Sequence, residues 1–160
     1  MLRTMKEKDL DGVMAIAKEH FDAVDMASRG YTYREGDTRK YIEEIAASTE
    51  YLPIISDVEG QIDGLIFFQI NYSPYNHKEM CASEHVWYVK KGKPAVYRGK
   101  LFMTLLKESV RVLKEMGISL ITVSLPETID FGESVGKFLK RNEFSRVDSI
   151  YKRRISHVSI

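Results

Sequence analysis

A run of large apolar residues near the middle of the chain constrains the fold more than any other feature of the sequence. It lies within "IDGLIFFQI" and consists of Leu65, Ile66, Phe67 and Phe68 in succession. Successive side chains of a β-strand point to opposite faces of the sheet, so this strand must be covered on both faces. The apolar run "YLPIISDV" precedes it across the turn "EGQ", which indicates an antiparallel hairpin.

Periodic apolar residues predict helices that can supply this cover. One helix follows Asp9, which we expect to cap it, and its apolar stripe consists of Leu10, Val13, Met14, Ala17 and Phe21. A second helix is expected to follow Asp37 or Thr38 and to end near Ser48, with an inward face of Tyr41, Ile42 and Ile45. A third and longer helix lies within "LFMTLLKESVRVLKEMG", where Gly117 marks its end.

Further segments complete the order of elements. Strands are expected in "MLRTM", "CASEHVWYVKK", "ISLITVSL" and "SRVDSIYKRRI", a short helix in "ESVGKFLKRNEF", and loops in "NYSPYNHKE" and "GKPAVYRG". The resulting order is β-α-α-β-β-β-α-β-α-β. It predicts an α/β (α+β) fold with a mixed, mostly antiparallel central sheet and helices on both faces. The chain, residues 1–160, suits a single domain with one core.

Charge and composition exclude several classes of protein. With 24 basic and 23 acidic side chains, the net charge of +1 argues against a chain built mainly to bind nucleic acid. The one cysteine, Cys81, rules out an intrachain disulfide and fits a reducing cytoplasm, where we expect the protein. No apolar stretch approaches the ~20 residues of a membrane span, and "MLRTMKEKDLDGV" does not read as a secretory signal. The histidines show no ligand spacing with Cys81, so we expect no metal.

The long helix is expected to begin without a side-chain cap. Tyr97, Arg98, Gly99 and Lys100 precede it, and none of them is a Ser, Thr, Asp or Asn. The first backbone N–H groups of a helix have no partner within it, and the helix dipole favours an anion beside them. Because Arg98 and Lys100 add positive charge and Gly99 allows a tight turn, the segment is a candidate phosphate cradle. A solvated helix start with two surface cations is the alternative.

In order of elements, "EHVWYV", "YRGK", the long helix and "ISLITVSL" resemble the GNAT superfamily of acyl-CoA N-acyltransferases. The resemblance implies that the helix start holds the pyrophosphate of acetyl-CoA through the fingerprint Arg/Gln-x-x-Gly-x-Gly/Ala. Arg98 matches its first position, whereas its small positions fall on Leu101 and Met103. The resemblance also implies a β-bulge that opens the sheet for the pantetheine arm, where a backbone N–H such as that of Val89 polarises the carbonyl. The implied cofactor-binding residues are Trp87, Tyr88, Val89, Tyr97, Arg98, Gly99, Lys100, Leu101, Phe102 and Met103.

Acyl transfer to an amine also needs a base and an acid. Glu84 and His85 begin the strand before the cradle and point to opposite faces, so one of them can face the substrate as a base or relay the proton through water. A solvated carboxylate and a partly buried, hydrogen-bonded histidine are the plain alternatives. The family's tyrosine acid falls near Leu139 in this chain and its asparagine near Gly132, which leaves Tyr151 or a water as the candidate acid.

The acceptor site is expected in the loops. Tyrosines and aspartates of "FDAVDMASRGYTYREGD", together with Tyr72 and Tyr75, could line a pocket for a cationic amine or pack over the edge of the core. The predicted function is an N-acyltransferase acting on a primary amine of a small molecule, peptide or protein, with a homodimer left open. The alternatives are a non-catalytic binding module of the same fold, and a nucleic-acid-modifying relative in which "YKRRISH" contacts phosphates rather than protecting a sheet edge.

Overall fold

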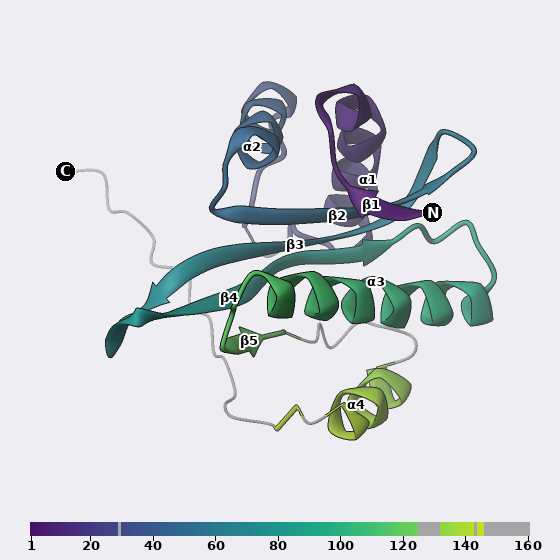
Figure 1. Cartoon of the computed structure of the whole chain (residues 1–160). Helices are drawn as coiled ribbons and strands as arrows, with labels where there is room; N and C mark the ends of the chain where they lie inside the picture. Colours follow the sequence, from purple (N-terminus) through teal and green to yellow (C-terminus); the bar gives the residue numbers. More distant parts are fainter. Residues whose placement is uncertain (29, 125–131, 143, 146–160) are drawn as a thin grey trace.

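The computed structural model describes residues 1–28, 30–124, 132–142 and 144–145 of the chain (Figure 1). Its sheet contains five strands in the order β1-β2-β3-β4-β5. Their bounds are β1 Leu2–Thr4, β2 Tyr51–Val58, β3 Gln61–Ser73, β4 Asn76–Val89 and β5 Leu120–Thr122. Neighbouring strands are antiparallel except β4 and β5, which are parallel, so the sheet is mixed and mostly antiparallel as predicted.

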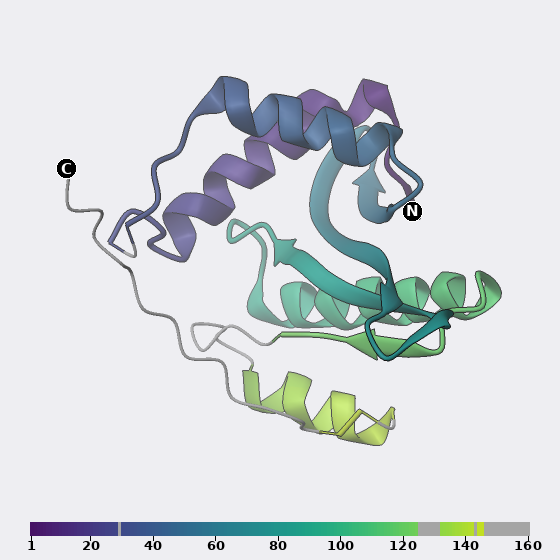
Figure 2. The same cartoon turned by 90° about the vertical axis from the view of Figure 1, so that its left-hand side faces the viewer.

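Helices cover both faces of this sheet, as the sequence predicted. On one face lie α1 (Leu10–Ala23), which the 3-10 turn η1 (Glu7–Asp9) precedes, and α2 (Glu35–Ala47). The other face carries α3 (Ala95–Glu115) and α4 (Gly132–Arg141) (Figures 1 and 2). The order of elements is the predicted one as far as α4. The last predicted strand, 145–155, lies outside the described residues apart from Ser145. None of the described helices is both long and apolar enough to cross a membrane.

The central strand β3 divides the core into two apolar clusters. Ile66 and Phe68 join the cluster beneath α3, whereas Leu65 and Phe67 join the cluster beneath α1 and α2. Each of these four side chains is at most 2% exposed. Alternation of side chains along one strand therefore feeds both clusters, which confirms the double cover that the apolar run predicted.

Beyond the core, β3 and β4 continue as a two-stranded arm, which we define as residues 70–80. The sequence predicted a loop over 71–79, and this prediction is wrong, because β3 runs to Ser73 and β4 begins at Asn76. Within the arm Tyr72 pairs with Met80. The arm extends past its neighbouring strands (Figure 1), so its side chains need not be apolar, and hydrophobic patterning gave no sign of it.

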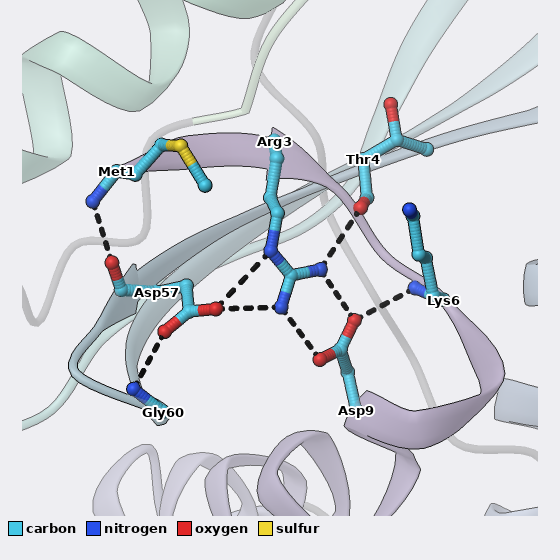
Figure 3. A network of polar contacts seen from close by, with 7 residues as sticks. All are labelled: Met1, Arg3, Thr4, Lys6, Asp9, Asp57 and Gly60. Atoms are coloured by element: carbon cyan, nitrogen blue, oxygen red, sulfur yellow. Dashed lines mark hydrogen bonds and ion pairs between the residues drawn. The ribbon is translucent and has the colours of Figure 1, made fainter.

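A polar cluster closes the N-terminal corner of the sheet (Figure 3). Arg3 donates to Asp9 (Nη1 to Oδ2, 2.6 Å) and to Asp57 (Nη2 to Oδ2, 2.7 Å). Asp57 also accepts a bond from the backbone N–H of Gly60, and Asp9 accepts one from that of Lys6. Asp9 was predicted to cap α1, but its carboxylate makes no cap bond there, because Arg3 and Lys6 engage both of its oxygens.

Candidate active site

Strands β4 and β5 diverge after a short parallel ladder. The two strands pair only from Cys81 to Ser83 of β4, opposite Leu120 to Thr122. Beyond Ser83, β4 continues to Val89, and no described strand lies against this edge. We call this open edge of β4, residues 84–89, the fork. On this edge the backbone groups that a neighbouring strand would bind are not paired with any described strand.

A β-bulge lies where the fork begins. Phe67 of β3 pairs with Val86 and Phe68 pairs with Glu84, so His85 is the extra residue. A bulge bends its strand and increases the local twist, which accounts for the end of the pairing between β4 and β5 at Ser83. The family resemblance implied such a bulge without giving its position, and the register of the ladder places it at His85.

The backbone of the fork presents donors and acceptors outward. Lys90 N donates to Asp63 O of β3 at 2.9 Å, so the backbone of Lys90 faces β3. Successive residues of a strand alternate between its two edges, so the N–H and C=O groups of Trp87 and Val89 face the fork. The donor expected on Val89 therefore lies on the edge where a ligand could use it.

Glu84 lies at the mouth of the fork with a carboxylate that titrates near neutrality. Its partner across the ladder, Phe68, belongs to the cluster beneath α3, so Glu84 points to that face of the sheet. Ser124 N, just beyond β5, donates to Glu84 Oε2 at 3.2 Å. Burial raises the pKa of Glu84 to about 7, although the bond from Ser124 acts in the opposite direction. Such a carboxyl can both accept and release a proton at physiological pH.

His85 faces the opposite side of the sheet, as the alternation of side chains predicted. Its Nε2 lies 2.5 Å from Tyr41 Oη of α2, and its ring meets the edge of the Tyr51 ring. Partial burial lowers the pKa of His85, which favours the neutral imidazole at pH 7. The structure therefore separates the two predicted catalytic residues: Glu84 lies on the α3 side of the fork and His85 on the α2 side.

The side chains of Trp87 and Tyr88 fix the far half of β4. Tyr88 Oη donates to Glu19 Oε1 of α1 at 3.0 Å, and Lys91 N donates to the same oxygen at 2.7 Å. Trp87 points to the other face and stacks on Phe102 of α3, with ring centroids 3.5 Å apart. Both aromatic side chains are buried, so this half of the strand is held by helices on both sides.

The start of α3 differs from the prediction. The helix begins at Ala95 with Pro94 as its N-cap residue, and Arg98 N donates to Pro94 O at 3.0 Å. The predicted loop over 92–99, with a helix start after Lys100, is therefore wrong. Proline fits the start of a helix because its missing N–H would have no partner there, and this signal is readable in the sequence.

The unbonded amides consequently lie three residues earlier than expected. They belong to Ala95, Val96 and Tyr97, since Arg98 N is already engaged within the helix. No side chain of the described residues caps them, and the first turn contains no acid. Val96 is 86% exposed, so this helix start is open to solvent. Of the other residues predicted to bind the cofactor, Leu101 and Phe102 are buried in the core, Gly99 and Met103 are half-buried, and Lys100 is exposed.

A buried carboxylate holds the loop before α3 in place. Asp63 of β3 accepts a hydrogen bond from Tyr97 Oη at 3.0 Å and pairs with Lys93 Nζ at 3.1 Å. The side chain of Asp63 is 2% exposed. It contacts the side chains of Lys93 in the loop and of Tyr97 in the first turn of α3, and no backbone amide of the helix start, so these amides remain available to an anion.

Other predicted residues lie elsewhere. Tyr75 (97% exposed) and Tyr72 (63% exposed) are on the arm, whereas Tyr33 packs on Phe21 beside α1. Tyr151 lies outside the described residues. Sequence reasoning missed Tyr51 and Ser124, and it gave Tyr41 as part of an inward helix face without its contact to His85. These residues come from distant elements and share no motif with β4. Within the described ranges, no group of three or more His, Cys, Asp or Glu could hold a metal ion.

Comparison with known proteins identifies the fold. No protein-family model and no curated protein sequence matches the chain. Several solved structures do match it over nearly its whole length. An aminoglycoside acetyltransferase from an uncultured soil metagenomic sample, in complex with sisomicin, gives a TM-score of 0.73 at 12% identity, covering 97% of this chain and 96% of that one.

Two bacterial proteins give similar values. The ribosomal-protein-alanine N-acetyltransferase of Brucella melitensis biovar Abortus 2308 has a TM-score of 0.69 at 15% identity, covering 97% of this chain and 99% of that one. A GNAT family acetyltransferase of Staphylococcus aureus subsp. aureus USA300_TCH1516 has a TM-score of 0.69 at 15% identity, covering 97% and 98%. At these identities the likeness shows the fold: the chain has the GNAT acetyltransferase architecture, as the resemblance implied.

Proposed function

We propose that the chain is an acyl-CoA-dependent N-acyltransferase that transfers an acetyl or other acyl group to a primary amine. The observation that carries the proposal is the position of Glu84, whose pKa is about 7, at the mouth of the fork. Amine acylation needs the amine deprotonated, and a base with a pKa near neutral pH suits that step. The shared fold supports the proposal, because the structural neighbours include acetyltransferases.

The residues of the fork and of the α3 start fit an acyl-CoA. The outward backbone groups of Trp87 and Val89 would pair with the amide-bearing arm of the donor. The amides of Ala95, Val96 and Tyr97 would hold its pyrophosphate, and the helix dipole and exposed Lys100 would add attraction. This assignment keeps the role predicted for the helix start but transfers it from residues 98–103 to residues 95–97.

In the proposed reaction Glu84 accepts the proton that an ammonium group must lose. When bound, acyl-CoA supplies an acyl group activated as a thioester. The nitrogen of the deprotonated amine would form a bond to the acyl carbon and release its second proton to solvent, and the carbon–sulfur bond would break as the sulfur leaves with its electron pair. A backbone N–H of the fork, that of Val89 in our assignment, polarises the carbonyl oxygen. The sulfur then takes a proton, for which Tyr151 and water remain the candidate sources.

The acceptor amine would approach from the α1 and α2 side of the sheet. On this side the bulge presents His85 beside Tyr41 and Tyr51, which offer aromatic and hydroxyl groups to a cationic ligand. His85 would bind or orient the acceptor there, and a water would relay the proton of the amine to Glu84 on the opposite face of the strand. Small amines, peptide N-termini and protein lysines all meet this chemical description.

A binding measurement and an activity measurement test the proposal together. Acetyl-CoA is titrated calorimetrically, and release of the CoA thiol is followed over a panel of amines with a thiol-reactive dye. We expect saturable binding and turnover with at least one amine. Absence of acetyl-CoA binding would exclude the acyltransferase, whereas binding without transfer to any amine would favour the non-catalytic module.

A further inference from the structure

Trp87 contains a buried donor whose acceptor is missing from the described part of the chain. It is the only tryptophan of the sequence and is 3% exposed. No described residue accepts a hydrogen bond from its Nε1. The hydroxyl of Ser109, by contrast, is fully buried and donates to Leu105 O at 2.9 Å. Buried donors are rarely left without an acceptor in folded proteins, so the lack of an acceptor for the indole N–H of Trp87 needs an explanation.

The position of Trp87 suggests that a ligand supplies the missing acceptor. Its backbone groups face the fork, and its ring lies flat on Phe102, two turns into α3. The indole therefore packs between β4 and α3, on the face of the sheet that α3 covers. A ligand that occupies both the fork and the helix start has to pass this side chain.

We propose that the indole Nε1–H of Trp87 donates a hydrogen bond to an amide carbonyl oxygen in the pantetheine arm of the acyl donor. The inference rests on the proposed function and assigns a side-chain contact beyond the backbone pairing of the fork. Because Nε1 is buried from solvent in the ligand-free chain, the contact requires the fork to open locally when the pantetheine chain of the donor binds.

This assignment gives the indole N–H opposite effects on two measurable quantities. Without ligand, a buried donor that lacks an acceptor destabilises the fold. With ligand, the same donor contributes to affinity. Replacing Trp87 by Phe keeps an aromatic ring on Phe102 and removes the N–H. The Trp87→Phe variant should therefore melt at a higher temperature than the parent and bind acetyl-CoA more weakly, by about fivefold to tenfold.

Phe102→Leu is the matched control. It removes the stacking partner and leaves the indole N–H in place, so it should lower the melting temperature through lost packing. Its binding of acetyl-CoA should fall less than that of Trp87→Phe. A role of Trp87 in packing alone would instead make both variants less stable and would not separate their affinities.

The experiment is a fluorescence titration of the parent chain, in which all tryptophan emission comes from Trp87. Acetyl-CoA and pantetheine both contain the pantetheine chain and should shift the emission to longer wavelength. The new hydrogen bond and the opening of the fork make the surroundings of the indole more polar. ADP, which lacks the pantetheine chain, should leave the emission unchanged. Calorimetry of the parent and of Trp87→Phe with acetyl-CoA accompanies the titration.

Two results would overturn the inference while leaving the acyltransferase intact. One is a parent chain that binds and transfers the acetyl group with no change in Trp87 emission. The other is a Trp87→Phe variant that binds acetyl-CoA as tightly as the parent. A shift caused equally by ADP would assign the indole to the phosphates instead and would also contradict the proposal. Failure of the parent to bind acetyl-CoA would remove the proposed function itself.

Discussion

The N-terminal corner and the fork are both polar, but they differ in how their polar groups are satisfied. At the corner, Arg3 engages both Asp9 and Asp57, and backbone amides engage both carboxylates (Figure 3). At the fork, the indole N–H of Trp87 and the outward backbone groups have no partner in the described structure. Satisfied groups stabilise the fold, whereas groups left open at a strand edge favour a ligand.

The largest effect should come from the carboxylate of the fork. Glu84→Gln keeps the shape of the side chain and removes the base, so kcat should fall by about 10²- to 10⁴-fold. Acetyl-CoA affinity should change little. In the parent, kcat should rise with pH through about 7, because the deprotonated form of Glu84 is the active one. Steady-state kinetics from pH 5.5 to 8.5 check both statements, and a variant that retains this pH profile would remove Glu84 from the mechanism.

Breaking the corner should have the next largest effect, on stability rather than on chemistry. Arg3→Met leaves the carboxylate of Asp9, which is 7% exposed, without its cationic partner. We expect the free energy of unfolding to fall by about 2–3 kcal/mol, measured by urea denaturation. Arg39→Met, which breaks an exposed pair with Asp11, is the control and should cost much less. Equal losses in the two variants would show that the corner is not a special source of stability.

The pH dependence of stability should carry opposite signs in the two regions. Hydrogen bonds from Arg3 lower the pKa of Asp9 and Asp57, so their contribution is present above pH 4 and is lost as the pH falls through their folded-state pKa. The raised pKa of Glu84 acts the other way. Between about pH 4.5 and 7 the folded chain holds a proton that the unfolded chain has released, so stability falls as the pH rises.

Glu84→Gln separates these two contributions. The variant should lose the decline between pH 4.5 and 7 and gain about 1–2 kcal/mol at pH 7, after allowance for partial exposure of the carboxyl. The loss of stability in acid, which originates at the corner, should remain. Thermal unfolding followed by circular dichroism across this pH range distinguishes the contribution of Glu84 from that of the corner. If stability declined between pH 4.5 and 7 as steeply in the variant as in the parent, the raised pKa of Glu84 would be contradicted.

The smallest effect on stability should come from closing the start of α3. Val96→Asp places an acid in the uncapped first turn, where it should stabilise the helix by about 0.3–1 kcal/mol through the dipole. The same charge should repel a pyrophosphate and weaken acetyl-CoA binding several-fold. Tyr75→Asp, on the arm, adds the same charge far from the site as a control. Equal affinity in both variants would argue that the phosphates bind elsewhere.

Much of the fold could be predicted from the sequence because its signals are local. The apolar run at 65–68 required cover on both faces, and helical periodicity supplied it. Glu84 and His85 could be picked out as a pair on opposite faces because alternation along a strand needs only the strand itself. These inferences depend on neighbouring residues, so no knowledge of the tertiary arrangement was needed.

The site itself depended on pairings that no local pattern encodes. The bulge at His85 follows from the register between two strands, and the end of the β4–β5 ladder at Ser83 depends on how far two distant segments stay together. Ser124 reaches Glu84 from 40 positions away. The start of α3 is different, because Pro94 marks it in the sequence, whereas the lack of a cap residue near Lys100 does not show where the helix begins.

Residue-resolved amide hydrogen exchange, measured with and without acetyl-CoA, tests the central claim most directly. We expect slower exchange at Trp87 and Val89 on the fork and at Ala95, Val96 and Tyr97 at the start of α3, with no change at the N-terminal corner. Unchanged exchange at these amides in the presence of saturating acetyl-CoA, or protection confined to other parts of the chain, would contradict the account.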